Sequence, residues 1–286
     1  MRIATCALLL MLFVVTGLQA EEKAVVSAAR RDARGFLVHD VQSPFQSGTT
    51  QIRVLMPDDL KSVASATKKP YPVVYVLPVE AALENRYGDG LLEVQKLDLH
   101  NKRQAVFVAP TFAQLPWYAD HPTQPGVRQE SHFVKVVVPF VDTHYPVIAK
   151  PEGRLLLGFS KSGWGAWSLL LRHPGMFQKA AAWDAPLMMD QPGKCGSGPI
   201  FGTAENFADY RISQLLAVRA TELQREKRLF LHGYGNFRAE HEQTHALLDS
   251  LRIAHTYLDG PARKHDWHSG WVPEAVEWLL SRNVSE

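Results

Sequence analysis

One short segment constrains the fold more than any other. The residues Gly158-Phe-Ser-Lys-Ser-Gly-Trp-Gly-Ala166 follow a run of leucines and precede a second leucine run that ends near Pro174. This order predicts a buried strand, a sharp turn that carries Ser160, and a helix that the proline ends. A serine on such a turn exposes its hydroxyl beside a helix N-terminus and needs small neighbours two positions away. Gly158 and Ser162 meet that need, although an ordinary strand–loop–helix joint is the simpler alternative.

Strands and helices are expected to alternate along the rest of the chain. Apolar alternation or continuous apolar runs predict strands, and helical spacing of apolar residues predicts helices. The expected strands cover residues 36–40, 51–55, 71–77, 105–109, 154–157, 179–183, 228–232 and 254–258. The expected helices cover 130–145, 162–172, 207–226, 238–252 and 273–281. This alternation predicts an α/β fold with a mostly parallel central sheet flanked by helices.

The N-terminus has the pattern of a secretory signal peptide. Arg2 precedes the apolar stretch 7–15, and Ala20 is a small residue at the expected cleavage point. We therefore expect a signal peptide over 1–20, one domain over 21–286, and a secreted or periplasmic location. The apolar stretch is too short to span a bilayer, so no stable membrane insertion is expected after cleavage. An uncleaved anchor is the lesser alternative.

Composition excludes some partners. The chain has 286 residues and a formal net charge of +2, without a long basic run, which argues against nucleic-acid binding. Cleavage of the leader would remove Cys6 and leave Cys195 as the single cysteine, so no internal disulfide is expected.

A serine nucleophile needs a general base, and the base needs an acid to orient it. His265 follows the last expected strand near the C-terminus, as a base would in the chain order serine, acid, histidine. His268 is a competing base. Asp266 is a poor partner for His265, because adjacent side chains on a loop seldom pair.

Together these segments resemble the α/β-hydrolase esterase family that includes esterase D, feruloyl and acetyl-xylan esterases and the mycolyltransferases. The resemblance covers nearly all of residues 36–281. The matching pieces are Val54–Pro57, Tyr71–Leu77, Trp117–Asp120, Pro139–Pro146, the Ser160 turn and His265–Trp267. The resemblance implies a single α/β-hydrolase domain, a nucleophile at Ser160 and a base at His265. It also implies an acyl-enzyme mechanism that requires no metal or organic cofactor.

The resemblance places the oxyanion-hole donors at the backbone N–H of Lys161 and of a residue after the strand 71–77. The family usually has a glycine-containing turn there, whereas this chain has Pro78. Proline has no N–H, so the second donor is expected to be Glu80, ahead of Val79.

The position of the acid is a second departure from the family pattern. Asn236 stands where the family has aspartate, and an amide cannot stabilise an imidazolium by charge. Asp184, directly after the strand 179–183, is the favoured replacement, because a carboxylate at a strand's C-terminal end faces the site crevice. Glu240 is the alternative acid. A simple capping or loop role remains the alternative for Asp184.

Two further segments contain residue types that can bind ligands. His241-Glu-Gln-Thr-His245 matches a zinc motif, but Leu251 occupies the position of a third ligand, and a solvated helix face explains the pattern better. No metal is therefore expected. Trp117, Tyr118 and Asp120 follow a strand end and are candidates for substrate binding, with packing of their own loop as the equal alternative.

The expected function is a secreted serine ester hydrolase that acts on a small-molecule or carbohydrate-linked carboxylic ester. An acyltransferase would use the same machinery, with an alcohol in place of water. A non-catalytic binding protein on a degenerate hydrolase scaffold is the other alternative, because Asn236, Ser162 and the missing turn glycine all depart from the family pattern.

Overall fold

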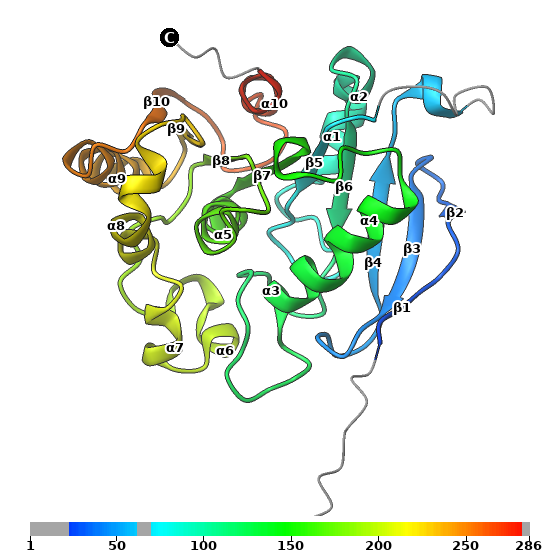
Figure 1. Ribbon diagram of the computed structural model, residues 1–286, viewed down its shortest axis with the longest axis horizontal. Helices are drawn as coiled ribbons and strands as arrows, with labels where there is room; N and C mark the ends of the chain where they lie inside the picture. The colour runs from blue at the N-terminus through cyan, green and yellow to red at the C-terminus, as the bar shows by residue number, and fades with distance from the viewer. Residues whose placement is uncertain (1–22, 62–69, 282–286) are drawn as a thin grey trace, which may run out of the picture.

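A ten-stranded sheet crosses the molecule (Figure 1). The computed structural model describes residues 23–61 and 70–281. The strands lie in the order β1-β3-β4-β6-β5-β7-β8-β9-β10, and β2 pairs with β3 beside this path. Their bounds are β1 Val25–Val26, β2 Arg30–Arg31, β3 Leu37–Gln42, β4 Thr50–Leu55, β5 Val73–Val76, β6 Val106–Pro110, β7 Arg154–Phe159, β8 Lys179–Trp183, β9 Leu229–Tyr234 and β10 His255–Ala262.

The direction of strand pairing divides the sheet. The strands β6, β5, β7, β8, β9 and β10 are parallel, whereas β3 and β4 form an antiparallel hairpin that joins the parallel part through β6. The predicted α/β fold is confirmed, and the eight expected strands correspond to β3 through β10. The short β1 and β2 were not expected, because two-residue strands have no readable apolar period.

Helices cover both faces of the sheet (Figure 1). The α-helices are α1 Gly90–Lys96, α2 Leu99–Lys102, α3 Gln129–His132, α4 Val138–His144, α5 Ser160–Arg172, α6 Gly198–Phe201, α7 Ala204–Ala208, α8 Ile212–Leu223, α9 Arg238–Ser250 and α10 Val272–Leu280. The 3-10 helices are η1 Asp58–Lys61, η4 Pro151–Gly153 and η5 Lys194–Gly196, and η3 Phe133–Val137 is π-helical. One core lies under α1 and α10, and a larger one lies under α3, α4, α5 and α8.

Two expected helices are interrupted. The helix expected over 130–145 is α3, the π-helical η3 and α4, and the wider turn of η3 directly precedes the helical stretch that contains Pro139, whose nitrogen cannot donate. The helix expected over 207–226 is α7 and α8, separated at Tyr210. The Tyr210 hydroxyl donates to Glu130 Oε2 at 2.7 Å and accepts from the Asp120 N–H at 3.0 Å, which fixes the break.

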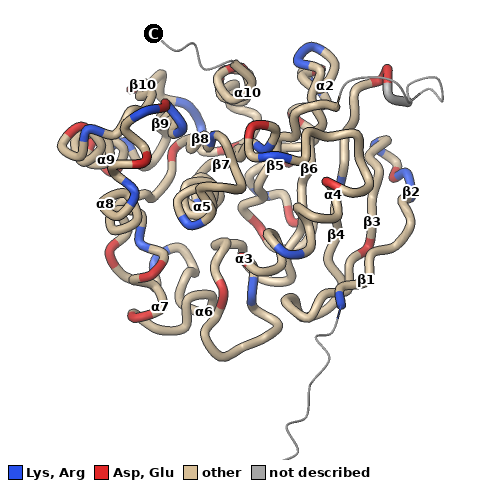
Figure 2. The backbone as a smooth tube through the Cα atoms, viewed as in Figure 1, with Lys and Arg blue, Asp and Glu red and all other residues tan. Residues whose placement is uncertain are grey.

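Charges are mixed along the backbone, with lysine and arginine interspersed among aspartate and glutamate (Figure 2). Within the described residues, no helix is both long enough and apolar enough to cross a bilayer. The expected signal peptide, residues 1–20, lies outside the described residues, so the leader and the location stay predictions.

A buried ionic network holds the larger core together around Glu130. Its Oε1 lies 2.8 Å from Arg172 Nε and 2.7 Å from His173 Nε2, at the end of α5. Burial alone would raise the pKa of Glu130, but its hydrogen bonds with His173, Arg172 and Tyr210 outweigh burial and lower the pKa to about 2. The network therefore ties α3, α5 and the α7–α8 break to one carboxylate.

We expect Glu130→Gln to lower the free energy of unfolding by about 3 kcal/mol at pH 7, because it leaves Arg172 without its buried partner. The lowered pKa means that the ionised carboxylate stabilises the fold fully above its unfolded pKa of about 4.3. That stabilisation is lost as the pH falls toward about 2. Urea unfolding at pH 7 and pH 3 measures both effects, and the gap between variant and wild type should narrow at pH 3. Glu205→Gln, at an exposed site on α7, is the matched control and should change little.

Candidate active site

Ser160 lies at the sharp junction of β7 and α5. Its backbone φ is +51°, in the left-handed region that residues with a Cβ rarely adopt. A Cβ on Gly158 would lie 2.1 Å from the carbonyl oxygen of Ser162, so the turn tolerates only glycine there. Helix α5 begins at Ser160, two residues earlier than expected. The turn thus holds a strained serine at a helix N-terminus, as a nucleophile requires.

Ser162 provides hydrogen bonds to the turn as well as a small side chain. Its hydroxyl donates to the carbonyl of Phe159 at 3.0 Å and accepts from the N–H of Phe159 at 3.1 Å. The side chain is completely buried. Ser162 therefore closes the turn by hydrogen bonding, a role that the size of the residue did not predict.

Asp184 and His265 form a hydrogen-bonded pair. The Nδ1 atom of His265 lies 2.5 Å from Oδ2 of Asp184. Asp184 directly follows β8 and is fully buried, while the His265 side chain is 14% exposed. Because Nδ1 is bound to the carboxylate, Nε2 is the ring nitrogen left for proton exchange. The structure thus joins the favoured acid and the favoured base.

The loop after β9 surrounds the Asp184 carboxylate with backbone N–H groups. Asn236 N–H lies 2.9 Å and 2.8 Å from the two carboxylate oxygens, and Phe237 N–H lies 2.7 Å from Oδ1. A Cβ on Gly235 would lie 2.8 Å from Oδ2, so glycine is needed for this close approach. Burial favours a raised pKa for Asp184, but the bonds from His265, Gly235, Phe237 and Asn236 outweigh it and lower the pKa. The carboxylate is therefore held in its ionised form.

Aromatic rings enclose the His265 imidazole. The ring centroids of Phe159, Tyr87 and Phe237 lie 5.1, 5.5 and 5.8 Å from that of His265. Phe159 is the residue directly before Ser160, so the base lies against the turn that carries the serine. The three rings pack around the imidazole and support its orientation toward Asp184.

The alternative base, His268, and the alternative acids, Asp266 and Glu240, form hydrogen bonds with other residues. His268 Nδ1 lies 2.6 Å from Glu93 Oε2 on α1, and the Asp266 carboxylate accepts from the His268 N–H. Glu240 Oε2 accepts from the Met188 N–H at 3.0 Å. Burial raises the pKa of Glu240, so it is less suited than Asp184 to stabilise a cation.

The backbone N–H groups of Lys161 and Glu80 are candidates for binding an oxyanion, and the Val79 N–H also has no acceptor among the described residues. Lys161 is in the first turn of α5, where N–H groups have no acceptor within the helix. The Glu80 N–H has no acceptor among the described residues. The Glu80 side chain is buried and accepts from the Tyr87 N–H at 3.3 Å, which fixes the loop that carries its N–H.

Tyr118 braces that same loop. Its hydroxyl donates to the carbonyl of Pro78 at 2.6 Å. The ring is fully buried against α5, where a Cβ on Gly165 would lie 2.0 Å from the ring. Tyr118 therefore links the β5 loop to the helix that begins at Ser160. This positioning role was not predicted from the sequence, because only the fold brings Pro78 to Tyr118.

The expected substrate-binding role of the 117–120 segment is not supported. Trp117 is fully buried, with its ring 5.6 Å from Trp164 and 6.1 Å from Phe201. Asp120 accepts from the N–H and hydroxyl of Ser131 at 2.9 and 2.5 Å. Neither Trp117 nor Tyr118 has an exposed face for a ligand, so the alternative, packing of their own loop, describes them.

The two histidines of the zinc-like motif, His241 and His245, have different hydrogen-bond partners in the structure. His241 is buried, and its Nε2 accepts from the Ala185 N–H at 2.8 Å. Burial lowers the pKa of His241 to about 4, so the ring is neutral and its lone pair is already used. His241 holds the residue next to Asp184 in place, and it is not free to bind a metal. His245 has different neighbours, described below.

The chain is similar in sequence to two curated proteins. Esterase Rv1288 and Esterase MT1326, from two strains of Mycobacterium tuberculosis, are each 23% identical over 196 residues. The match spans 63% of this chain and 41% of each relative's length, so the chain covers less than half of those proteins.

Solved structures agree in fold. The fluorophosphonate-binding serine hydrolase FphF of Staphylococcus aureus has a TM-score of 0.70 at 16% identity, covering 90% of this chain and 100% of its own. An S-formylglutathione hydrolase of Agrobacterium tumefaciens has a TM-score of 0.64 at 14% sequence identity, and the match covers 90% of this chain and 99% of that chain. The ferulic acid esterase AmCE1/Fae1A of Anaeromyces mucronatus has a TM-score of 0.54 at 17% sequence identity, and the match covers 90% of each chain.

A family model described as "Putative esterase" matches residues 46–232. The chain therefore belongs to this esterase family of α/β-hydrolases.

Proposed function

We propose that the protein is a serine carboxylic ester hydrolase that works through an acyl-enzyme. The observation that carries the proposal is the Asp184–His265 hydrogen bond, made beside the strained turn of Ser160. A buried carboxylate bound to Nδ1 of a histidine beside such a turn is the arrangement that orients the general base of a serine hydrolase and stabilises its imidazolium form. Family membership supports the same reaction class.

The reaction follows from the roles of these groups. The Ser160 hydroxyl attacks the ester carbonyl, while His265 Nε2 takes its proton and passes it to the leaving alcohol. Asp184 stabilises the imidazolium that forms. The N–H groups of Lys161 and Glu80 donate to the oxyanion of the tetrahedral intermediate. Water, activated by His265, then releases the acid and regenerates the serine.

The proposed substrate is a carboxylic ester, with a carbohydrate-linked acyl ester as one candidate, since a structural neighbour is a ferulic acid esterase. Transfer of the acyl group to an alcohol would use the same residues. Export is proposed on the N-terminal residue pattern alone.

The nucleophile is tested by paired substitutions on the turn. We expect Ser160→Ala to abolish both hydrolysis of p-nitrophenyl acetate and labelling by a fluorophosphonate probe. Ser162→Ala should keep labelling and most activity, but lower the free energy of unfolding by about 1 kcal/mol, because it removes two hydrogen bonds. Labelling that survives Ser160→Ala, or that disappears only in Ser162→Ala, would contradict this assignment.

The acid is tested by removing charge without changing shape. Asp184→Asn should lower kcat by about three to four orders of magnitude with KM little changed, as loss of a triad acid does. Glu240→Gln is the matched control and should cost less than about tenfold. Thermal unfolding of both variants verifies that they fold.

The opposite substitution distinguishes an active site from a degenerate one. Asn236→Asp should not raise kcat, because Asp184 already binds His265. If Asn236→Asp raised kcat strongly while Asp184→Asn had no effect, the acid would be misassigned. The non-catalytic binding protein would then be the better interpretation.

The bracing role of Tyr118 gives a kinetic test of the oxyanion loop. Tyr118→Phe removes the hydrogen bond to Pro78 while keeping the ring, so we expect kcat to fall about tenfold with KM nearly unchanged. Tyr75→Phe is the matched control: Tyr75 is also fully buried, but its hydroxyl has no partner among the described residues. Equal effects of the two substitutions would show that Tyr118 has no special role.

A further inference from the structure

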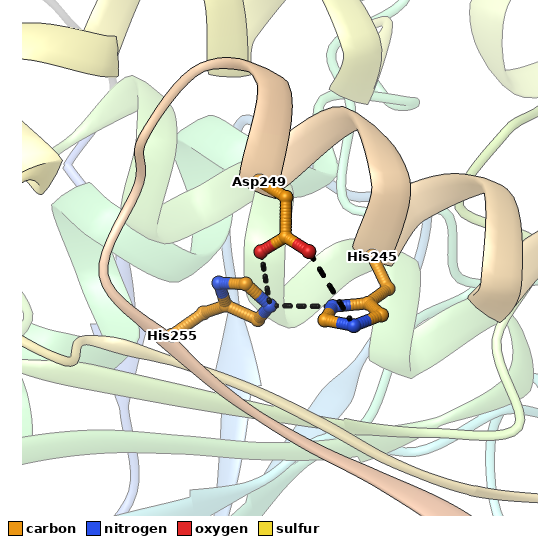
Figure 3. Close-up of side chains that lie close together, drawn as sticks. All are labelled: His245, Asp249 and His255. Carbon is orange, nitrogen blue, oxygen red and sulfur yellow. Dashed lines mark hydrogen bonds and ion pairs between the residues drawn. The ribbon is translucent and has the colours of Figure 1, made fainter.

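A second cluster of side chains with potential metal ligands lies apart from the residues of the proposed triad. It consists of His245 and Asp249 on α9 and His255 at the start of β10 (Figure 3). His245 Nδ1 lies 2.8 Å from His255 Nε2. The Asp249 carboxylate lies 3.6 Å from His245 Nε2 and 4.0 Å from His255 Nε2. One nitrogen or oxygen from each residue falls within 4.8 Å of the others.

The hydrogen bonds determine which nitrogen of His255 faces the cluster. His255 Nδ1 lies 2.8 Å from the carbonyl oxygen of Ile253. A carbonyl only accepts, so Nδ1 carries the hydrogen and Nε2 of the neutral ring carries a lone pair directed at His245. Metal-binding histidines typically have their second ring nitrogen fixed by a carbonyl or carboxylate in this way. The His255 side chain is only 7% exposed, so its orientation is well defined.

The other two residues leave the cluster open to solvent. The side chains of His245 and Asp249 are 36% and 63% exposed. Their i, i+4 spacing places both on one face of α9, and the ring of Tyr257 packs 4.2 Å from that of His245. An ion can therefore enter from solvent and keep a bound water.

The donor set indicates the kind of ion. Two imidazoles and one carboxylate are ligands that Zn²⁺ accepts, at about 2.0–2.2 Å from the metal. In tetrahedral geometry such bonds separate the donor atoms by about 3.4 Å. The contacts at 2.8 and 3.6 Å use different nitrogens of His245, so they describe two alternative donor sets. One ligand atom from each residue lies within 4.8 Å of the other two, so side-chain rotations can bring such a set to tetrahedral spacing. Calcium and magnesium prefer oxygen ligands and fit poorly.

We propose that His245, Asp249 and His255 form a binding site for a divalent transition metal, with Zn²⁺ as the best fit. One ring nitrogen of His245, Nε2 of His255 and a carboxylate oxygen of Asp249 bind the ion, and water completes the coordination. The site uses only one histidine of the His241–His245 motif, because the Nε2 lone pair of His241 is bound to the Ala185 N–H. The sequence motif therefore indicated the wrong partner for His245.

The proposed site joins two elements that lead to the active site. Helix α9 also carries His241, which holds the residue next to Asp184, and β10 leads into the loop of His265. None of the three ligands is part of the proposed triad. Metal binding is therefore expected to stabilise the fold and to leave the esterase chemistry unchanged.

The test measures binding directly on untagged protein dialysed against EDTA. Calorimetric titration with Zn²⁺ should give one ion per chain, and Co²⁺ should give visible absorption bands of a low-symmetry site. Asp249→Asn and His255→Ala should each weaken Zn²⁺ binding about tenfold or more. His144→Ala, which removes an exposed histidine on α4, is the matched control and should bind like the wild type.

Stability supplies a second measurement. Zn²⁺ should raise the Tm of the wild type and of His144→Ala, because a ligand that binds only the folded state stabilises it. At the same Zn²⁺ concentration the rise should be smaller in Asp249→Asn, whose metal-free Tm should match the wild type because Asp249 is exposed. Absence of Zn²⁺ binding by the wild type would overturn the proposal. Binding by Asp249→Asn and His255→Ala that is as strong as binding by the wild type would also overturn it.

Discussion

The buried charge of Asp184 is the interaction on which the site depends. A carboxylate without solvent exposure is costly unless its oxygens are bound, and here His265 and the backbone N–H groups of Asn236 and Phe237 bind them. The N–H groups belong to the loop after β9, and His265 belongs to the loop after β10. One ionised side chain at the end of β8 therefore sets the positions of two neighbouring loops, and with them the imidazole beside Ser160.

A second buried carboxylate, that of Glu130, fixes the far end of the helix that begins at Ser160. Glu130 gathers Arg172, His173 and Tyr210 around one carboxylate and fixes the far end of α5. At the near end, Ser162 closes the turn, and Tyr118 connects α5 to the loop of Glu80. The helix that presents the serine is thus tied down at both ends by buried polar contacts. Rigid support of this kind is what positions catalytic groups.

Much of this could be predicted from the sequence, and the remainder has a clear physical origin. Apolar periodicity predicted β3 through β10, and the spacing around Gly158 predicted the turn of Ser160. The position of Asp184 after a strand predicted a place near the crevice, and the structure pairs it with His265. The roles of Tyr118, Ser162 and Gly235 could not be predicted, because each depends on a backbone atom that folding brings near. For Trp117 the sequence left packing and binding equally open, because an aromatic residue near a strand end has the same pattern in both cases, and only the fold shows that its ring is buried.

The supply of N–H groups by the loop after β9 has a consequence for how this site can diversify. Because Asp184 is held by the backbone of residues 235–237, the side chains at positions 236 and 237 carry no part of the acid's charge. An enzyme whose acid lies on that loop must keep one side chain there unchanged. In this protein the proposed acid lies on another segment, so the Asn236 side chain is not needed to hold its charge, whereas Gly235 and the backbone path are. The side chain at position 236 can therefore differ without loss of the Asp184–His265 hydrogen bond.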